Sequence, residues 1–235
     1  MDWKKKYKKA LTFSYDDGNE QDKKLLEILN RYGMKCTFNV NTGLDYDHGT
    51  WMYRDVLEVH RLNLAECPDL YDGHEMAVHG VCHYNLTELS PAELTAELQG
   101  NADAIQKIYG TAPVGMAYPY GVYNDAVIAE LRRMGIGSAR GVESSHSFAV
   151  QDDLMRFRPT CHHDDPMLFD LAEQFLQSES ETSQIFYVWG HSYELEGQQN
   201  WDRLERFCEM MAGKADVFYG TNREVLLPEW ENREK

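Results

Sequence analysis

The chain has 235 residues, and its 43% hydrophobic content is enough for one continuous core. Its formal net charge of −16 disfavours polyanionic partners, so we expect neither nucleic acid nor an anionic membrane as a partner. No stretch resembles a secretory leader or a membrane span, and the five cysteines are an odd number without repeating spacing, which is typical of free thiols. These features favour a cytoplasmic location, while a secreted mature form whose leader has been removed stays open.

Taken in chain order, short apolar runs alternate with segments of helical periodicity. The expected strands cover residues 10–15, 36–41, 75–79, 114–118, 136–139, 157–160, 185–189 and 216–219. The expected helices cover residues 20–32, 51–62, 90–109, 124–134, 165–176 and 201–212. The helix at 90–109 has the clearest boundaries, because Ser90 and Glu93 form a capping box and Gly110 follows its last turn.

This alternation predicts an α/β fold, a compact and distorted (β/α) barrel with about seven parallel strands, in a single catalytic domain spanning residues 1–235. In parallel barrels the working groups lie at the carboxyl ends of the strands. Every candidate residue follows a predicted strand in this way: Asp16, Asp17, His79, Tyr120, Arg140 and His191.

Two segments carry the residue types of a divalent-metal centre. Residues 12–18 read T-F-S-Y-D-D-G, and residues 79–83 read H-G-V-C-H. The histidine spacing lets both imidazoles face the same way if this segment forms one helical turn. One carboxylate and two imidazoles suit zinc, cobalt or nickel, and the second carboxylate is then free to act as a base. The alternative is an ordinary Asp-Asp-Gly turn with a solvated pair of histidines.

In order and spacing, these segments resemble the NodB-like polysaccharide deacetylases, a family of metal-dependent carbohydrate esterases. Residues 12–18 are similar to the family's T-F-D-D-G motif with two residues inserted, and residues 79–83 are similar to its H-[ST]-x-x-H motif except at Gly80. Residues 118–121 are similar to its R-x-P-Y-G motif without the leading arginine, and residues 189–191 are similar to its final histidine after a strand. The resemblance extends over about half of the chain.

The resemblance implies that the protein removes N-acetyl groups from an amino sugar or short oligosaccharide with one divalent ion, zinc or else cobalt or nickel. The implied metal ligands are Asp17, His79 and His83. The implied catalytic groups are Asp16 as general base, the Tyr120 backbone N–H as oxyanion donor and His191 as general acid. The candidate substrate contacts are Pro119, Tyr120, Trp189 and Trp201, although aromatic side chains at this density are more often core.

The chain departs from the family pattern at the arginine that normally pairs with the base carboxylate, because Ala117 stands there, and its fourth motif is not recognisable. Barrel order places the strand that ends at Ala139 beside the strand before Tyr118. We therefore expect the Arg140 guanidinium to reach the Asp16 carboxylate. A surface position for this arginine is the alternative.

Two other groups are weighed against the metal centre. Residues 161–165, C-H-H-D-D, look rich in metal ligands, but neighbouring side chains in an extended chain point to opposite faces, so we expect a helix lead-in with one histidine near the pocket. Cys82 lies between the two ligand histidines, and the family resemblance assigns it to packing.

Two other functions stay open besides deacetylation. One is a ring-opening amidohydrolase of the same superfamily that acts on a cyclic ureide or imide, and the other is a carbohydrate-binding relative without catalysis. The oligomeric state is not predicted.

Overall fold

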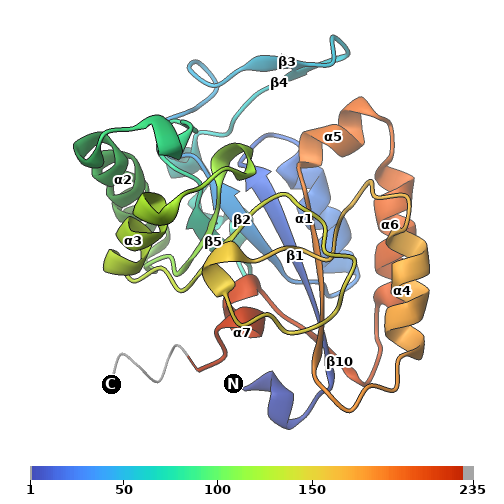
Figure 1. Ribbon diagram of the computed structural model, residues 1–235. Helices are drawn as coiled ribbons and strands as arrows, with labels where there is room; N and C mark the ends of the chain where they lie inside the picture. Colours follow the sequence, from blue (N-terminus) through green and yellow to red (C-terminus); the bar gives the residue numbers. More distant parts are fainter. Residues whose placement is uncertain (1, 230–235) are drawn as a thin grey trace.

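The computed structural model describes residues 2–229, and its centre is a strongly curled parallel sheet (Figure 1). Its strands are β1 (Lys9–Asp17), β2 (Cys36–Val40), β5 (Glu75–Val78), β6 (Gly115–Ala117), β7 (Ser138–Arg140), β8 (Cys161–His162), β9 (Gln184–Gly190) and β10 (Val217–Tyr219). Their order is β7-β6-β5-β2-β1-β9-β8, β10 pairs with the beginning of β1, and every pairing is parallel.

The curled sheet nearly closes on itself between β7 and β9. The Phe157 N–H donates to the Ala139 carbonyl on one side, and three residues later the Thr160 N–H donates to the Tyr187 carbonyl on the other. The strand expected at 157–160 is therefore a bridging segment, and the regular strand β8 begins just after it. A compact, distorted barrel with about seven parallel strands is confirmed.

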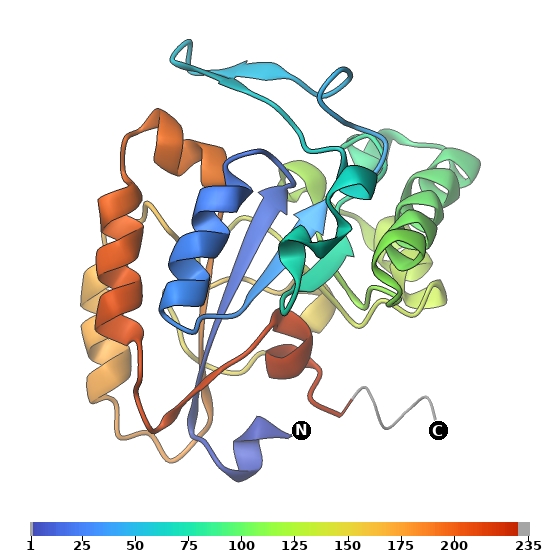
Figure 2. The ribbon, with the colours of Figure 1, turned by 180° about the vertical axis from the view of Figure 1, so that it is seen from behind.

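Helices cover the outside of the sheet (Figures 1 and 2). They are α1 (Asp22–Arg31), α2 (Pro91–Tyr109), α3 (Asp125–Arg133), α4 (Leu168–Gln177), α5 (Ser192–Gly197), α6 (Trp201–Met211) and α7 (Asn222–Leu226). The expected capping box is present at α2, where Ser90 and Glu93 bond reciprocally and Gly110 ends the helix at φ 74°. None of the helices within residues 2–229 is both long and apolar enough to cross a membrane.

The helix expected over residues 51–62 is wrong. This segment is an antiparallel hairpin of β3 (Trp51–Tyr53) and β4 (Leu57–Val59), which stands above the carboxyl ends of the barrel strands (Figure 1). The turn places Arg54 and Asp55 at φ 49° and 57°, in the left-handed region that Asn-Gly normally occupies. Because Arg-Asp lacks that signal, the sequence does not indicate the turn of the hairpin.

The short helices α5 and α7 were not expected, and the helix expected from residue 165 begins at Leu168. Helices this short show little periodicity, so their start depends on local capping. In α5 the cap comes from the Glu194 carboxylate, which accepts from the His191 backbone N–H at 3.1 Å, and an S/T-x-x-E pattern search does not find it.

The interior between the sheet and α4 and α6 is aromatic. Phe186 on β9 is fully buried, and its ring lies 5.4 Å from that of Phe175 and 5.6 Å from that of Phe207. Such edge-to-face contacts add to the apolar area buried by each ring.

We predict that Phe186→Ala lowers the free energy of unfolding by about 3–5 kcal/mol, because it removes a buried ring and leaves a cavity. Denaturant titration measures the loss. Met52→Ala, on the exposed hairpin, is the control and should change stability by less than about 0.5 kcal/mol. Equal effects of the two substitutions would show that this aromatic cluster is not part of the core.

Candidate active site

Strand β1 ends in the two adjacent carboxylates at the floor of a cleft. Asp16 and Asp17 are 3% and 4% exposed, so each charge needs a partner inside the protein. Asp17 has φ 82° and the following Gly18 has φ 66°, so the chain turns sharply where the strand stops. This turn lets two neighbouring side chains, which alternate in a regular strand, both serve the same cleft.

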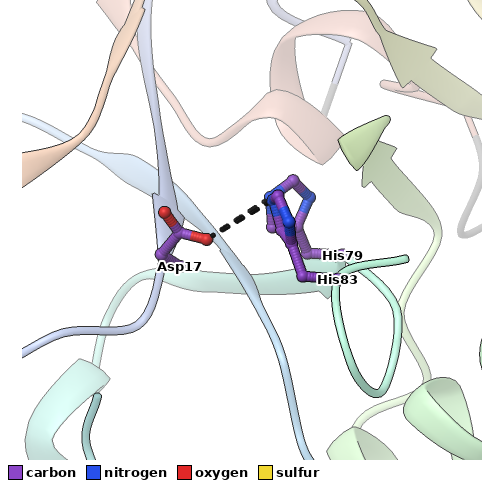
Figure 3. Close-up of side chains that lie close together, drawn as sticks. All are labelled: Asp17, His79 and His83. Atoms are coloured by element: carbon purple, nitrogen blue, oxygen red, sulfur yellow. Dashed lines mark ion pairs between the residues drawn. The ribbon is translucent and has the colours of Figure 1, made fainter. Parts of the chain in front are cut away.

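Asp17 faces the two imidazoles across the cleft (Figure 3). Its Oδ1 lies 3.8 Å from His79 Nε2 and 3.6 Å from His83 Nε2, and the donor atoms of the three residues lie within 4.8 Å of one another. Ligands held about 2.0–2.2 Å from a tetrahedral zinc ion would lie about 3.4 Å apart. The three donor atoms are therefore spaced for one divalent ion.

The imidazoles are in the state that a metal requires. His79 Nδ1 lies 2.7 Å from the Ala117 carbonyl, which only accepts, so this nitrogen carries the proton and Nε2 keeps its lone pair. His79 Nε2 is buried without a hydrogen-bond partner, which is costly unless a ligand takes it up. Burial and then the neighbouring His79 lower the pKa of His83 to about 4, so this ring is neutral at pH 7. The residues present fit a metal ion.

The segment between the two histidines is not the expected helical turn. Gly80 has φ 83° and His83 has φ 58°, both in the left-handed region. The rings nevertheless lie 4.7 Å apart, because the loop and not a helix brings them together. The two imidazoles lie close together as expected, but the helical turn expected between them is wrong.

Arg140, the last residue of β7, makes the contact expected of it. Its Nη2 donates to Asp16 Oδ1 at 2.5 Å, and its Nε donates to Ser14 Oγ at 3.1 Å. The guanidinium is 1% exposed and lies 4.7 Å from the ring of Trp189. Asn39 Nδ2 donates to the same Asp16 oxygen at 2.9 Å. Two donors therefore hold one oxygen of the candidate base.

Asp17 has an arginine partner that the sequence did not predict. Arg61, which follows the hairpin, donates from Nη2 to Asp17 Oδ1 at 2.8 Å and from Nη1 to the Gly49 carbonyl at 3.2 Å. Its guanidinium lies 4.6 Å from the Trp51 ring. Burial alone would raise the pKa of Asp17, but the cations His191 and Arg61, with His79 and His83, outweigh it and lower this pKa to about 2.

His191 begins α5 on the opposite side of the carboxylates. Its Nε2 lies 4.0 Å from Asp16 Oδ2 and 3.9 Å from Asp17 Oδ2, and its Nδ1 lies 3.1 Å from Glu194 Oε2. Burial lowers the pKa of His191, but Glu194 and the two aspartates outweigh it and raise this pKa to about 9. The ring is therefore protonated at pH 7, as a general acid must be.

Glu194 was missed because its signal is only the i+3 spacing to His191. The same carboxylate oxygen accepts from His162 Nε2 at 2.9 Å and from the His191 backbone N–H at 3.1 Å. Of the ligand-rich run 161–165, His162 thus supports Glu194, while His163 is buried against the Tyr15 hydroxyl at 3.1 Å. The Asp164 N–H donates to His162 Nδ1, so the proton of this ring is on Nε2. Because Nε2 then donates to Glu194, this cluster is a hydrogen-bonded network rather than a second metal centre.

Two adjoining cavities of about 460 and 480 Å³ form the cleft and share the Asp17, His83, Tyr120 and Tyr193 side chains. Trp51 and Arg61 line the cavity below the hairpin, and Trp189 and His191 line the other. Tyr120 is 63% exposed at the rim with its ring 4.6 Å from that of His83, and Pro119 before it is buried.

Trp201 does not line either cavity. It begins α6, where its Nε1 donates to Glu196 and Lys24 lies over its ring at 4.7 Å. This position does not support the expected sugar contact. Tyr193, in both cavities, lies where such a contact is possible.

The fold and this donor set define the class: a parallel α/β half-barrel with a candidate metal centre at the carboxyl ends of its strands. A family model described as polysaccharide deacetylase matches residues 4–139. The chain belongs to the polysaccharide deacetylase family. The uncharacterised protein YlxY of Bacillus subtilis (strain 168) is 28% identical over 120 residues, which cover 50% of this chain and 33% of that protein. The chain thus matches about a third of that relative's length.

Solved structures share the fold at low identity. The chitin deacetylase of the fungal pathogen Colletotrichum lindemuthianum is 21% identical with a TM-score of 0.57, covering 94% of this chain and 88% of that one. A CE4 family pseudoenzyme from Bacillus anthracis is 16% identical with a TM-score of 0.56, covering 93% of this chain and 66% of that one. The similar structures thus include both a deacetylase and a pseudoenzyme.

We predict that Arg140→Lys lowers the free energy of unfolding of the metal-free protein by about 1–3 kcal/mol, because lysine keeps the charge but cannot donate to both Asp16 and Ser14 in a fixed fork. Arg133→Lys is the matched control, since its ion pair with Glu130 is on the surface and should be worth less than about 1 kcal/mol. Denaturant titration compares the two, and equal losses would contradict a buried anchoring role for Arg140.

Proposed function

We propose that the protein is a metal-dependent hydrolase that removes N-acetyl groups from an amino sugar or a short oligosaccharide. The observation that carries this proposal is the convergence of three kinds of group in one cleft. These are a metal triad with a bare His79 Nε2, a carboxylate held by Arg140 and a protonated imidazole at His191. Family membership supports the reaction class, and the acetyl group and sugar are part of the proposal.

Asp17, His79 and His83 would hold one divalent ion, zinc or else cobalt or nickel. A bound ion would polarise the amide carbonyl and acidify a water molecule. The ligand geometry is available because Asp17 is fixed by Arg61 and His79 by the Ala117 carbonyl.

Asp16 would take the proton of the attacking water as general base. Its Oδ1 is occupied by Arg140 and Asn39, which leaves Oδ2 as the oxygen to receive a proton. A base with one oxygen fixed presents the other in a constant direction, so little reorganisation accompanies proton transfer.

His191 would give its proton to the amide nitrogen as the carbon–nitrogen bond breaks. Without that proton the tetrahedral intermediate would expel water and return to the amide. Glu194 orients the ring from the far side, so that Nε2 faces the carboxylates. Acetate and the ammonium form of the amine leave, because the hydroxyl proton of the intermediate passes to the released amine, and the proton that Asp16 accepted restores His191.

The Tyr120 backbone N–H is our candidate donor to the oxyanion. Pro119, directly before Tyr120, makes this turn rigid. Tyr120 itself has φ 57°, an uncommon conformation for a residue with a side chain. The exposed Tyr120 ring and the largely buried Trp189 and Tyr193, which line the cavity, would contact the sugar.

Loss of the metal is the first test. Elemental analysis of wild-type protein after reconstitution should give about one divalent ion per chain, and His79→Ala should lose it, because the triad then keeps one imidazole. His74→Ala, which lies outside the cleft, is the control and should keep the ion. Equal metal contents of wild type and His79→Ala would place the metal elsewhere.

The base and the acid can be separated by the leaving group. On an N-acetylated sugar, Asp16→Asn and His191→Ala should each lower kcat by at least ~10², the usual effect of losing general base or acid catalysis. On an aryl acetate ester, whose leaving group needs no proton, His191→Ala should be nearly unimpaired while Asp16→Asn stays slow.

Metal content and circular dichroism of both variants control for misfolding. If His191→Ala is as slow on the ester as on the amide, its role as the acid is wrong. Acetate release by wild type also distinguishes a deacetylase from a carbohydrate-binding relative without catalysis. Ring opening of a cyclic imide, without acetate release, would support the amidohydrolase alternative.

A further inference from the structure

The loop of residues 79–83 has neither helical nor strand hydrogen bonds of its own. Its backbone groups are buried or half-buried, so each N–H and C=O needs a partner from elsewhere. The precision with which a metal triad is held depends on these partners, because two of its three side chains begin on this loop.

Four consecutive N–H groups of the loop are accepted by one turn of α2. Asn101 Oδ1 accepts from the N–H groups of His79 at 2.9 Å and Gly80 at 3.1 Å. The Glu97 backbone carbonyl accepts from Val81 at 3.2 Å, and Glu97 Oε1 accepts from Cys82 at 2.6 Å.

The other edge of the loop is held by the segment after β2. Asn41 Nδ2 donates to the carbonyls of His79 and Gly80 at 2.7 and 3.1 Å, and the Gly43 N–H donates to the Val81 carbonyl at 2.9 Å. Asn101 also spans the gap, since its Nδ2 donates to the Val40 carbonyl at 3.0 Å. The loop is therefore clamped from both sides.

Glu97 and Asn101 are unusual residues for the inner face of a helix. They are 6% and 0% exposed among the apolar residues of α2, where a carboxylate or amide is costly unless it is satisfied. Their spacing of four places both on one face, directed at the loop. A polar pair retained at this cost has a task that an apolar pair could not do.

Gly80 is the steric counterpart of Glu97. A Cβ at position 80 would lie 2.7 Å from Glu97 Oε1, and the residue has φ 83°. The serine or threonine of the similar H-[ST]-x-x-H motif would have to displace this carboxylate from its hydrogen bond with the Cys82 N–H. The departure at Gly80 thus has a physical reason in the partner that α2 supplies.

We propose that Glu97 and Asn101 are positioning residues for the metal centre: they fix the backbone of residues 79–82 from α2 and so hold His79 and His83 in ligand geometry. This inference concerns the loop in the metal-free protein, and its consequence for metal affinity rests on the proposed function. The partner is a divalent cation, and the task of the two residues is preorganisation.

Amide hydrogen exchange of the metal-free protein tests the backbone role. Asn101→Leu removes the acceptor of two loop N–H groups, and Glu97→Leu removes the acceptor of a third. We expect exchange at residues 79–82 to become at least ~10-fold faster in both variants. Glu97→Gln keeps an acceptor oxygen and should exchange nearly as wild type does.

Metal affinity gives the second readout, by competition for zinc with a chromophoric chelator. Asn101→Leu and Glu97→Leu should weaken binding by about 10–100-fold, the usual effect of losing a group that orients a ligand. Leu98→Ala is the matched control: it lies fully buried on the same helix between the two residues and should lower the melting temperature without changing loop exchange or zinc affinity.

The proposal is overturned if the two leucine variants behave like Leu98→Ala, with lower stability but unchanged loop exchange and metal affinity. It is overturned for Glu97 if Glu97→Gln fails as fully as Glu97→Leu, because the charge and not the acceptor would then matter. If wild type binds no metal, the proposed function fails, and the exchange measurement still decides whether α2 holds the loop.

Discussion

The structure depends on two neighbouring carboxylates buried at the end of one central strand. Removing Asp16 and Asp17 from water is unfavourable unless positive charge and hydrogen bonds replace the solvent. Arg140 supplies them for Asp16 from the sheet, and Arg61 supplies them for Asp17 from the segment after the hairpin. His191 lies within 4.0 Å of both. The floor of the cleft is thus a charge-balanced cluster.

Polar groups of fixed orientation surround this cluster, and each ionisable side chain keeps one free atom that faces the cleft. Hydrogen bonds hold Asp16 at Oδ1, His79 at Nδ1 and the backbone of His191. The opposite atoms of these side chains face the interior of the cleft. Satisfying one end of a group while leaving the other bare is how a rigid protein prepares a site for a ligand.

Much of this arrangement was predictable from sequence, because strand ends are strongly patterned. A parallel sheet brings residues at successive strand ends to one edge, so Asp17, His79 and His191 could be placed together and Arg140 could be matched to Asp16. The pairing of Arg140 with Asp16 and the choice of His191 also drew on the family resemblance. Their chemical roles stay predictions.

The contributions of Arg61 and Glu194 could not be predicted, since both depend on irregular backbone. Arg61 comes after a hairpin whose Arg-Asp turn has no recognisable sequence signal, and it was assigned to a helix. Glu194 acts through a one-turn helix too short to show periodicity. Trp201 is the opposite case. It follows His191 closely in the sequence, but it lies on the outer helix α6 and not in the cleft.

The hairpin of β3 and β4 affects both the shape of the cleft and the charge at its floor. Surface hairpins can usually be exchanged, because their loss leaves the scaffold intact. Here the Arg61 guanidinium, which holds Asp17, lies against the Trp51 ring of the hairpin and donates to the Gly49 carbonyl just before it. A graft that replaced the hairpin would change the neutralisation of Asp17 together with the shape of the cleft. The shape of the cleft and the charge balance at its floor are therefore coupled.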